Sequence, residues 1–203
     1  MGLSVEALVL LALLTLSPGP DTILTLRQSL TAGLSIALWT AAGISSGVVV
    51  HSALSGAGLA VLLQRFPAAY RTVQFLGVAY LCYLGVRSLW SAWSDRKGSA
   101  APAVDASSRA GGFRDGLAAN LLNPKVALFY LGFLPQFIAP GEGFFATAVL
   151  YGVSHALMGM VWLGSVAILA ARLRSHVTRP GFRVTTEVVC GVALLGFAVR
   201  LAL

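Results

Sequence analysis

Charged side chains are scarce in this chain. Only 10% of its 203 residues are Asp, Glu, Lys or Arg, whereas 57% are hydrophobic and the mean hydropathy is +0.83. Soluble domains carry about 25% charged residues, so this composition speaks against a soluble globular domain. It indicates instead a protein that crosses the membrane several times.

Cysteines are equally few, and the familiar catalytic motifs do not occur. Cys82 and Cys190 each lie inside an apolar stretch, which speaks against a disulfide framework and favours small packing residues. The sequence contains no phosphate-binding loop, no His-Glu-x-x-His, no Cys-x-x-Cys and no nucleophile elbow. We therefore expect no enzyme, no ATP-driven mechanism, no cofactor and no resident metal.

Apolar windows of about 20 residues, the length that crosses a bilayer as a helix, recur along the chain. They predict six helices, at about 4–30, 34–63, 72–93, 114–138, 144–171 and 184–203. The first window lacks a basic start and a small-residue cleavage site, so we expect a retained span and no signal peptide.

A polar segment of about residues 94–112 divides the predicted helices into two groups of three. Its charged and small residues are typical of a flexible, solvated linker. Because three is an odd number, the second half, 113–203, would lie upside down relative to the first half, 1–93. The predicted fold is an all-α membrane protein with six transmembrane helices in an inverted three-plus-three repeat, its first and fourth helices broken.

Basic residues indicate how these helices are oriented. The net charge is +7, but the basic residues lie between apolar windows, which favours contact with anionic headgroups over nucleic acid. Ten of them fall in one set of alternate loops: Arg27, Arg87, Arg96, Lys97, Arg109, Arg114, Arg172, Arg174, Arg179 and Arg183. Three fall in the other set: Arg65, Arg71 and Arg200. Cytoplasmic loops are rich in Lys and Arg, so we expect the central linker in the cytoplasm and both termini on the other side.

Helix-breaking residues interrupt the first and fourth windows at matching places. The first interruption is Ser17-Pro18-Gly19-Pro20-Asp21, and the second is Asn120-Leu121-Leu122-Asn123-Pro124-Lys125. Broken helices are costly in hydrocarbon because freed backbone groups find no water there. Paired breaks at corresponding positions are typical of a transporter's substrate site, and a simple proline kink is the alternative for each.

Each break is expected to end one helix and to start another. Pro18 has no amide hydrogen, so it leaves the carbonyl of Leu14 without a donor. Ser17 and Asn123 are the predicted N-caps, followed by Pro18 and Pro124 at the first helical position. A restarted helix would direct open amides and its positive end into the bundle, which suits a carboxylate.

One acid and one base lie at these breaks. An ion in hydrocarbon costs about 3 kcal/mol, more than the about 0.3–1 kcal/mol that a helix dipole supplies. We therefore expect Asp21 to bind an ammonium group or a proton. Lys125 opposes the dipole of the helix that it would begin, so we expect it to meet an anion, either a substrate carboxylate or Asp21 itself.

Further polar side chains lie inside the predicted spans. His51 and His155 are candidates for a proton path because histidine titrates near neutral pH, and an interhelical hydrogen bond is the alternative for each. Asn120 flanks the second break, where substrate contact and a packing hydrogen bond explain it equally well. Glu187 is expected near the membrane interface, at the start of the last helix.

Several motifs together carry a family resemblance. They are Leu16-Ser17-Pro18-Gly19-Pro20-Asp21, the glycines from Gly33 to Gly47, and the Asn120–Lys125 segment followed by Phe133-Leu134-Pro135-Gln136-Phe137. The chain resembles the LysE/RhtB superfamily of amino-acid exporters over essentially its whole length, and the homoserine/threonine-type branch most. The resemblance implies export from the bacterial cytoplasm across the inner membrane, driven by the proton motive force. Many relatives carry Asn after Pro-Gly-Pro, where this chain carries the titratable Asp21.

The expected function is secondary transport: export of neutral, zwitterionic amino acids by proton antiport. The expected substrate-binding residues are Ser17, Pro18, Gly19, Pro20, Asp21, Asn120, Asn123, Pro124 and Lys125. The expected partners are an amino acid, protons and the lipid bilayer, and a homodimer is compatible with the sequence. The alternative is a carrier or channel for cations or metal ions, which would need several converging ligands.

Overall fold

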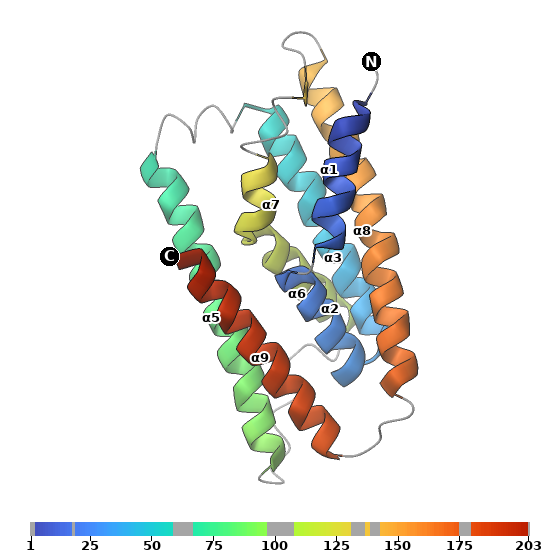
Figure 1. The fold of residues 1–203 in the computed structure, drawn as a ribbon, viewed down its shortest axis with the longest axis vertical. Helices are drawn as coiled ribbons and strands as arrows, with labels where there is room; N and C mark the ends of the chain where they lie inside the picture. Colours follow the sequence, from blue (N-terminus) through green and yellow to red (C-terminus); the bar gives the residue numbers. More distant parts are fainter. Residues whose placement is uncertain are drawn as a thin grey trace.

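The computed structural model describes residues 3–17, 19–58, 67–96, 108–130, 137–138, 143–174 and 180–202. Within these ranges the chain is helical and contains no strand, which confirms the predicted all-α class. The helices, labelled as in Figure 1, are α1 (Val5–Leu16), α2 (Pro20–Thr31), α3 (Leu34–Gly56), α5 (Pro67–Arg96), α6 (Arg109–Leu121), α7 (Pro124–Leu128), α8 (Phe144–Arg174) and α9 (Pro180–Ala202).

Local sequence signals account for many of the helix ends. Proline has a backbone angle that suits the first helical position, and four helices begin on one: α2, α5, α7 and α9. The turn between α2 and α3 needs a glycine, because Gly33 has a φ of 110°, a value that L side chains rarely adopt. Its amide donates to the carbonyl of Gln28 at 2.9 Å and so closes α2.

The helices extend into the segment predicted as a linker. Helix α5 continues to Arg96 and α6 begins at Arg109, so both ends of the 94–112 segment are helical. Residues 97–107 lie outside the described part of the chain.

Two of the described helical stretches are long and apolar enough to cross a membrane: Leu34–Gly56 and Phe144–Leu173. Helices α1 and α2 pass the same test together, bent by 46° at the break between them, and would count as a third span. Length and composition of the described helices therefore support a membrane protein.

The helices pack as two groups that lie side by side (Figure 1). In the larger group α3 packs against both α6 and α8, while α5 and α9 run along each other as a pair. Helix α2 joins the groups because it contacts α3, α8 and α9. The breaks α1–α2 and α6–α7 both lie at mid-height of the bundle (Figure 1).

Glycines allow α3 and α6 to approach each other closely. A Cβ atom added to Gly43 of α3 would lie 2.1 Å from the carbonyl oxygen of Phe113. One added to Gly116 of α6 would lie 2.1 Å from the carbonyl oxygen of Thr40. Small residues at helix contacts let backbones pack together in membranes, and here they hold Asn120, near the end of α6, against α3.

A buried ion pair between α2 and α9 corrects the expectation for Arg27. Nε and Nη2 of Arg27 donate to the two carboxylate oxygens of Glu187 at 2.6 and 3.1 Å, and the hydroxyl of Ser88 donates to the same carboxylate. Arg27 and Glu187 are only 8% and 1% exposed. Arg27 is therefore part of α2 and not a free loop charge, and Glu187 is buried within the protein, where each charge needs its partner. The expected place of Glu187 near the membrane interface stays a prediction.

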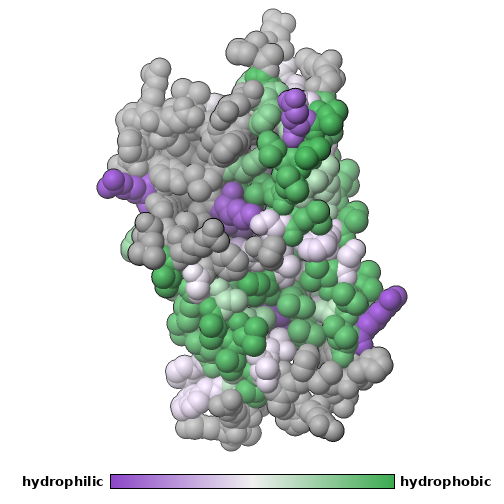
Figure 2. Space-filling model, in the orientation of Figure 1, coloured by the Kyte–Doolittle hydropathy of each residue, from purple (hydrophilic) through white to green (hydrophobic). Residues whose placement is uncertain are grey.

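The outer faces of α1 and α8 are apolar. Figure 2 shows hydrophobic side chains gathered on this side of the molecule, and Val5, Leu13, Val161 and Leu169 are each more than half exposed. Apolar surface of this extent is suited to contact with lipid.

Candidate functional site

The first break separates α1 from α2. The amide of Ser17 still donates to a carbonyl of α1 at 3.0 Å, so Ser17 closes α1. Helix α2 begins at Pro20, with Gly19 as its extended N-cap. The prediction that Ser17 caps the restarted helix is therefore wrong, because the restart uses the second proline of the motif. Pro18 lies outside the described residues.

The start of α2 keeps its amides open. Among the described residues, no side chain caps its first turn. The first-turn amides of Asp21 and Thr22, together with the positive end of the helix dipole, are therefore directed at the break. Such a helix start attracts an anionic group.

The second break separates α6 from α7 and has the predicted cap. Oδ1 of Asn123 accepts a hydrogen bond from the amide of Lys125 at 3.1 Å, and Pro124 occupies the first helical position. The prediction of Asn123 as N-cap is confirmed. Because Asn123 already satisfies this amide, the second break offers fewer open donors than the first.

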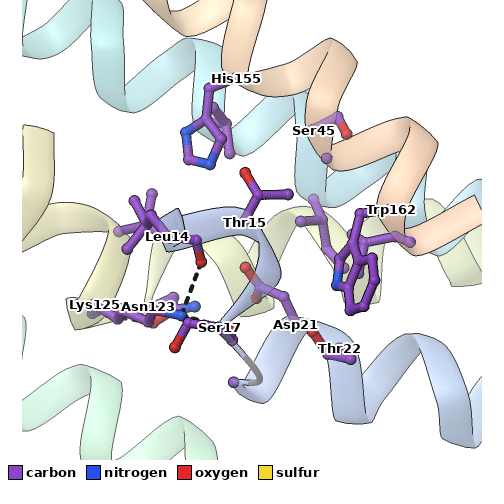
Figure 3. Close-up of a pocket in the computed structure, with 16 residues that line it drawn as sticks. Leu14, Thr15, Ser17, Asp21, Thr22, Ser45, Asn123, Lys125, His155 and Trp162 are labelled. Atoms are coloured by element: carbon purple, nitrogen blue, oxygen red, sulfur yellow. Dashed lines mark hydrogen bonds between the residues drawn. The ribbon is translucent and has the colours of Figure 1, made fainter. Parts of the chain in front are cut away.

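The side chain of Lys125 reaches from the second break to the first. Its Nζ donates to the carbonyl oxygens of Ser17 at 2.7 Å and of Leu14 at 3.1 Å (Figure 3). The carbonyl of Leu14 is the one that a proline at position 18 leaves without an amide donor. The end of α1 also carries the negative pole of its dipole. Lys125 therefore stabilises α1 while it opposes the dipole of its own helix.

Asp21 is oriented by Asn120. Nδ2 of Asn120 donates to Oδ2 of Asp21 at 2.9 Å, whereas Oδ1 of Asp21 is buried without a hydrogen-bond partner in the described structure. Among the described ion pairs within 4.0 Å, none joins Asp21 to Lys125. The two charges are close enough to attract each other, but the direct pair considered from the sequence is not formed.

A cavity of about 50 Å³ lies between the two breaks (Figure 3). It has room for a few water molecules, at about 15 Å³ each. Helices α1, α2, α3, α7 and α8 contribute to its walls. Six of the predicted residues line it: Ser17, Gly19, Asp21, Asn123, Lys125 and His155.

Other predicted residues do not line this cavity. Pro20 is the first residue of α2. Asn120 is fully buried, and its side-chain amide donates to Asp21. The backbone oxygen of Asn120 lies 3.1 Å from Nε2 of His51. Asn120 therefore contacts a lining residue, Asp21, whereas His51 contacts Asn120. For Pro124 the structure describes the place in the helix and not the ring.

Both histidine rings lie against the Tyr130 ring. Nδ1 of His155 lies 2.9 Å from the hydroxyl of Tyr130, and the His51 ring stacks on Tyr130 with centroids 6.4 Å apart. Both histidines thus make the interhelical contacts that were the alternative to a proton path. His155 in addition faces the cavity.

The sequence interpretation missed the cavity wall formed by α3 and α8, together with Thr15 of α1. The missed lining residues include Thr15, Ile44, Ser45, Gly159, Trp162 and Leu163. Small, hydroxylated and aromatic residues are ordinary in apolar windows, so the sequence carried little signal for them. Ser45 and Trp162 carry polar atoms in otherwise apolar stretches, which is a weak signal in the sequence.

Comparison with known proteins assigns the chain to a family. It matches the family described as LysE type translocator over residues 12–203, which include both breaks and the whole cavity. The chain belongs to the LysE type translocator family. The resemblance seen in the sequence motifs is thereby confirmed.

Two similar proteins are named for efflux. The leucine efflux protein of Klebsiella pneumoniae subsp. pneumoniae is 31% identical over 194 residues, 92% of this chain and 88% of its own. The homoserine/homoserine lactone efflux protein of Salmonella typhimurium is 33% identical over 174 residues, 83% of this chain and 80% of its own. An uncharacterized membrane protein of Pseudomonas aeruginosa is 33% identical over 192 residues, 92% of this chain and 88% of its own. No solved structure matches the chain.

Proposed function

We propose that this translocator exports amino acids from the cytoplasm through a site between the two helix breaks. The observation that carries the proposal is the arrangement of Asp21 and Lys125, an acid and a base on one small cavity that form no ion pair in the described structure. A free amino acid carries one ammonium and one carboxylate group, so its charges match this arrangement. The names of the two efflux relatives support the same class of cargo.

The carboxylate of the cargo would lie toward Lys125 and the start of α2. A lysine ammonium has three N–H donors, and carbonyls of α1 and the break occupy two of them. The third donor, together with the open amides in the first turn of α2, suits a carboxylate.

The ammonium of the cargo would lie against Asp21. Asn120 already binds one carboxylate oxygen, and the other has no partner in the described structure. Leaving a buried charged acceptor unpaired is costly, so an arriving ammonium group would be bound strongly. Asn120 would hold the carboxylate in place for that contact.

Proton antiport is the proposed means of energy coupling. Protonation of Asp21 would remove the negative charge that holds the cargo's ammonium, so proton and cargo would compete for one carboxylate. His155 lines the same cavity and contacts Tyr130, which supports it as a second proton-handling group. Competition for a single carboxylate is sufficient to make cargo release depend on proton binding.

We also propose the inverted six-span arrangement in the bacterial inner membrane, with both termini away from the cytoplasm. The position of both breaks at mid-height (Figure 1), facing one cavity, supports it, as does the excess of basic residues on one set of loops. Substrate sites of inverted-repeat transporters lie near the bilayer midplane between the repeats.

A carrier for cations or metal ions is the alternative, and it has less support. In the described ranges no three His, Cys, Asp or Glu side chains lie close enough to share a metal ion. Metal sites use several converging ligands, whereas the described lining of this cavity offers one carboxylate and one imidazole beside a lysine.

Export from loaded cells tests the proposed function. Cells that overproduce the protein are loaded with neutral amino acids, and their efflux is compared with that of cells lacking it, with and without an uncoupler. We expect faster efflux that the uncoupler removes, and loss of the gain in Asp21→Asn. Equal efflux from both kinds of cell would contradict the proposal.

A matched acidic variant controls for charge loss. Glu6 is exposed on α1 and does not line the cavity, so Glu6→Gln should export like the wild type. If Asp21→Asn also exported like the wild type, the substrate site would not be where we propose it.

A further inference from the structure

Unpartnered polar atoms converge on the cavity from three helices. Among the described residues, five buried side-chain atoms have no hydrogen-bond partner. Three of these five belong to residues that line the cavity: Oδ1 of Asp21, Oγ of Ser45 and Nε1 of Trp162. Leaving such an atom unsatisfied costs about 1–3 kcal/mol, so their shared location indicates a ligand that completes the bonds.

Ser45 differs from other serines in the described helices. The hydroxyls of Ser46, Ser154 and Ser165 each donate to the carbonyl four residues back, at 2.9, 2.9 and 2.7 Å, as helix serines commonly do. Oγ of Ser45 makes no such bond in the described structure. It faces Gly159 of α8, where an added Cβ atom would lie 3.6 Å from it and within 4 Å of no other described neighbour. The glycine therefore leaves space in front of the hydroxyl.

Trp162 places a hydrogen-bond donor on the same side of the cavity. An indole N–H can only donate, and Nε1 has no acceptor within the described part of the chain. In Figure 3, Ser45 and Trp162 lie on one side of Asp21, and Ser17 and Lys125 lie on the other. An amino acid held between Lys125 and Asp21 would extend its side chain toward Ser45 and Trp162.

We propose that Ser45 and Trp162 form a polar subsite that selects amino acids with an oxygen atom on a short side chain. The inference rests on the proposed function. The N–H of Trp162 would donate to the cargo oxygen, and the hydroxyl of Ser45 would accept from a cargo hydroxyl or donate to a carbonyl. Homoserine and threonine meet this requirement, whereas leucine, norvaline and valine do not.

The selectivity follows from what an apolar cargo leaves unpaired. A purely apolar pocket rejects an added hydroxyl weakly, but a site built to bond a hydroxyl strongly rejects the analogue that lacks it. Ile44 and Leu163 line the same wall and would contact the carbon atoms of either cargo. The difference in exchange rate between homoserine and norvaline therefore depends on the hydroxyl of Ser45 and the indole N–H of Trp162 alone.

Exchange across vesicle membranes tests the subsite. Proteoliposomes that contain the full chain are loaded with one unlabelled amino acid, and uptake of the same amino acid in labelled form is measured, which requires no driving force. The cargoes are homoserine and its near-isostere norvaline, threonine and its near-isostere valine, and leucine. With two hydrogen bonds worth about tenfold each, we expect wild-type exchange to favour homoserine over norvaline by about 100-fold.

Two variants and one control assign the effect to the subsite. Ser45→Ala and Trp162→Phe should each lower the homoserine-to-norvaline ratio about tenfold. Ser46→Ala should leave the ratio unchanged, because that hydroxyl bonds within its own helix and does not line the cavity.

The possible results separate this inference from the proposed function. If the wild type exchanges none of the five amino acids, both are overturned. The subsite is overturned if the wild type exchanges both members of each isosteric pair at equal rates. It is also overturned if both variants keep the wild-type homoserine-to-norvaline ratio. In either case the proposed export of amino acids is retained. Should Ser45→Ala fail to fold, the ratio measured for Trp162→Phe decides.

Discussion

At the scale of single residues, Lys125 serves two helices at once. It begins α7, where its charge opposes the dipole, and its Nζ binds two carbonyls at the end of α1 and in the break that follows. From the sequence we expected an anion as its partner. The structure shows that a proline-freed carbonyl is a partner as well, which gives Lys125 a structural role beside the proposed binding of cargo.

Replacing Lys125 should therefore lower stability as well as transport. Hydrogen bonds from a charged donor contribute about 1.5–3 kcal/mol, and Lys125→Met removes both. Because the bond to Ser17 is exposed and water replaces it, we expect the unfolding free energy to fall by about 1.5–3 kcal/mol, the value of one such bond. Denaturant titration in detergent measures this change, and amino-acid exchange should be lost. Lys125→Arg keeps the charge and the donors and should lose less stability. Wild-type stability in Lys125→Met would show that these carbonyl contacts contribute nothing.

Residues whose chemistry is costly in a membrane could be found from the sequence. Asp21 and Lys125 stood out because ions in hydrocarbon need a reason, and both line the cavity. Ser45 and Gly159 did not stand out because serine and glycine are ordinary in membrane helices. The hydroxyl of Ser45 makes no bond within its own helix, and Gly159 lies opposite it. Both features follow from the packing of α3 on α8, which the sequence does not show.

At the scale of elements, the contact between α3 and α6 determines where Asn120 lies. Gly43→Ala would place a methyl group 2.1 Å from the carbonyl oxygen of Phe113, so the helices must separate. We expect a loss of about 1–3 kcal/mol, measured by denaturant titration. Amino-acid exchange should also slow, because Asn120 would be displaced from Asp21.

A glycine with free space provides the control for this variant. An added Cβ atom at Gly196 of α9 meets nothing within 4 Å among the described residues. Gly196→Ala should therefore be neutral or stabilise by about 0.4–1 kcal/mol, because alanine loses less conformational entropy on folding. If Gly43→Ala were equally harmless, close packing would not be what positions Asn120.

The starts of α2 and α7 show which helix ends can be predicted from the neighbouring residues alone. Asn123 was predicted correctly as a cap because one capping residue directly precedes one proline. In the first break two prolines can occupy the first helical position, and the prediction of Ser17 as cap chose the first proline where the structure uses the second. Where α2 begins depends on how far α1 continues. The last hydrogen bond of α1 comes from the amide of Ser17, so Ser17 belongs to the end of α1 and α2 begins after it.

At the scale of the whole molecule, the Arg27–Glu187 pair fastens α9 and its partner α5 to the rest of the bundle. The pair is buried, and Ser88 of α5 binds the same carboxylate. A second contact lies nearby, where Asp115 of α6 accepts from Gln28 at 3.3 Å and lies 3.9 Å from Arg87. Polar links of this kind connect the two groups of helices.

A double-mutant cycle measures that link. Glu187→Leu alone should cost about 3–5 kcal/mol, because it leaves a buried, unpaired arginine, whereas Arg27→Met with Glu187→Leu should recover most of the loss. The measurement is the unfolding free energy of each variant in detergent. Additive losses in the double variant would contradict a direct, buried pair.

Which helices pair with each other was beyond the sequence. Apolar windows predicted helices because they report on each segment separately, but Arg27 and Glu187 are 160 residues apart in the chain. Arg27 was counted as a loop charge and Glu187 as an interfacial acid because neither segment shows its partner. Only the packing of α2 against α9 brings the two charges together.

In the proposed site, Asp21 and Lys125 hold the two charges of one amino acid. The most direct test measures how much each ligand raises the unfolding midpoint of the purified protein. The ligands are homoserine, γ-hydroxybutyrate, which lacks the ammonium group, and aminopropanol, which lacks the carboxylate. In the wild type, homoserine alone should raise the midpoint clearly. In Asp21→Asn, homoserine and γ-hydroxybutyrate should raise the unfolding midpoint equally, because the partner of the ammonium group is lost. If homoserine still raised the midpoint more in this variant, Asp21 would not be the residue that binds the ammonium group.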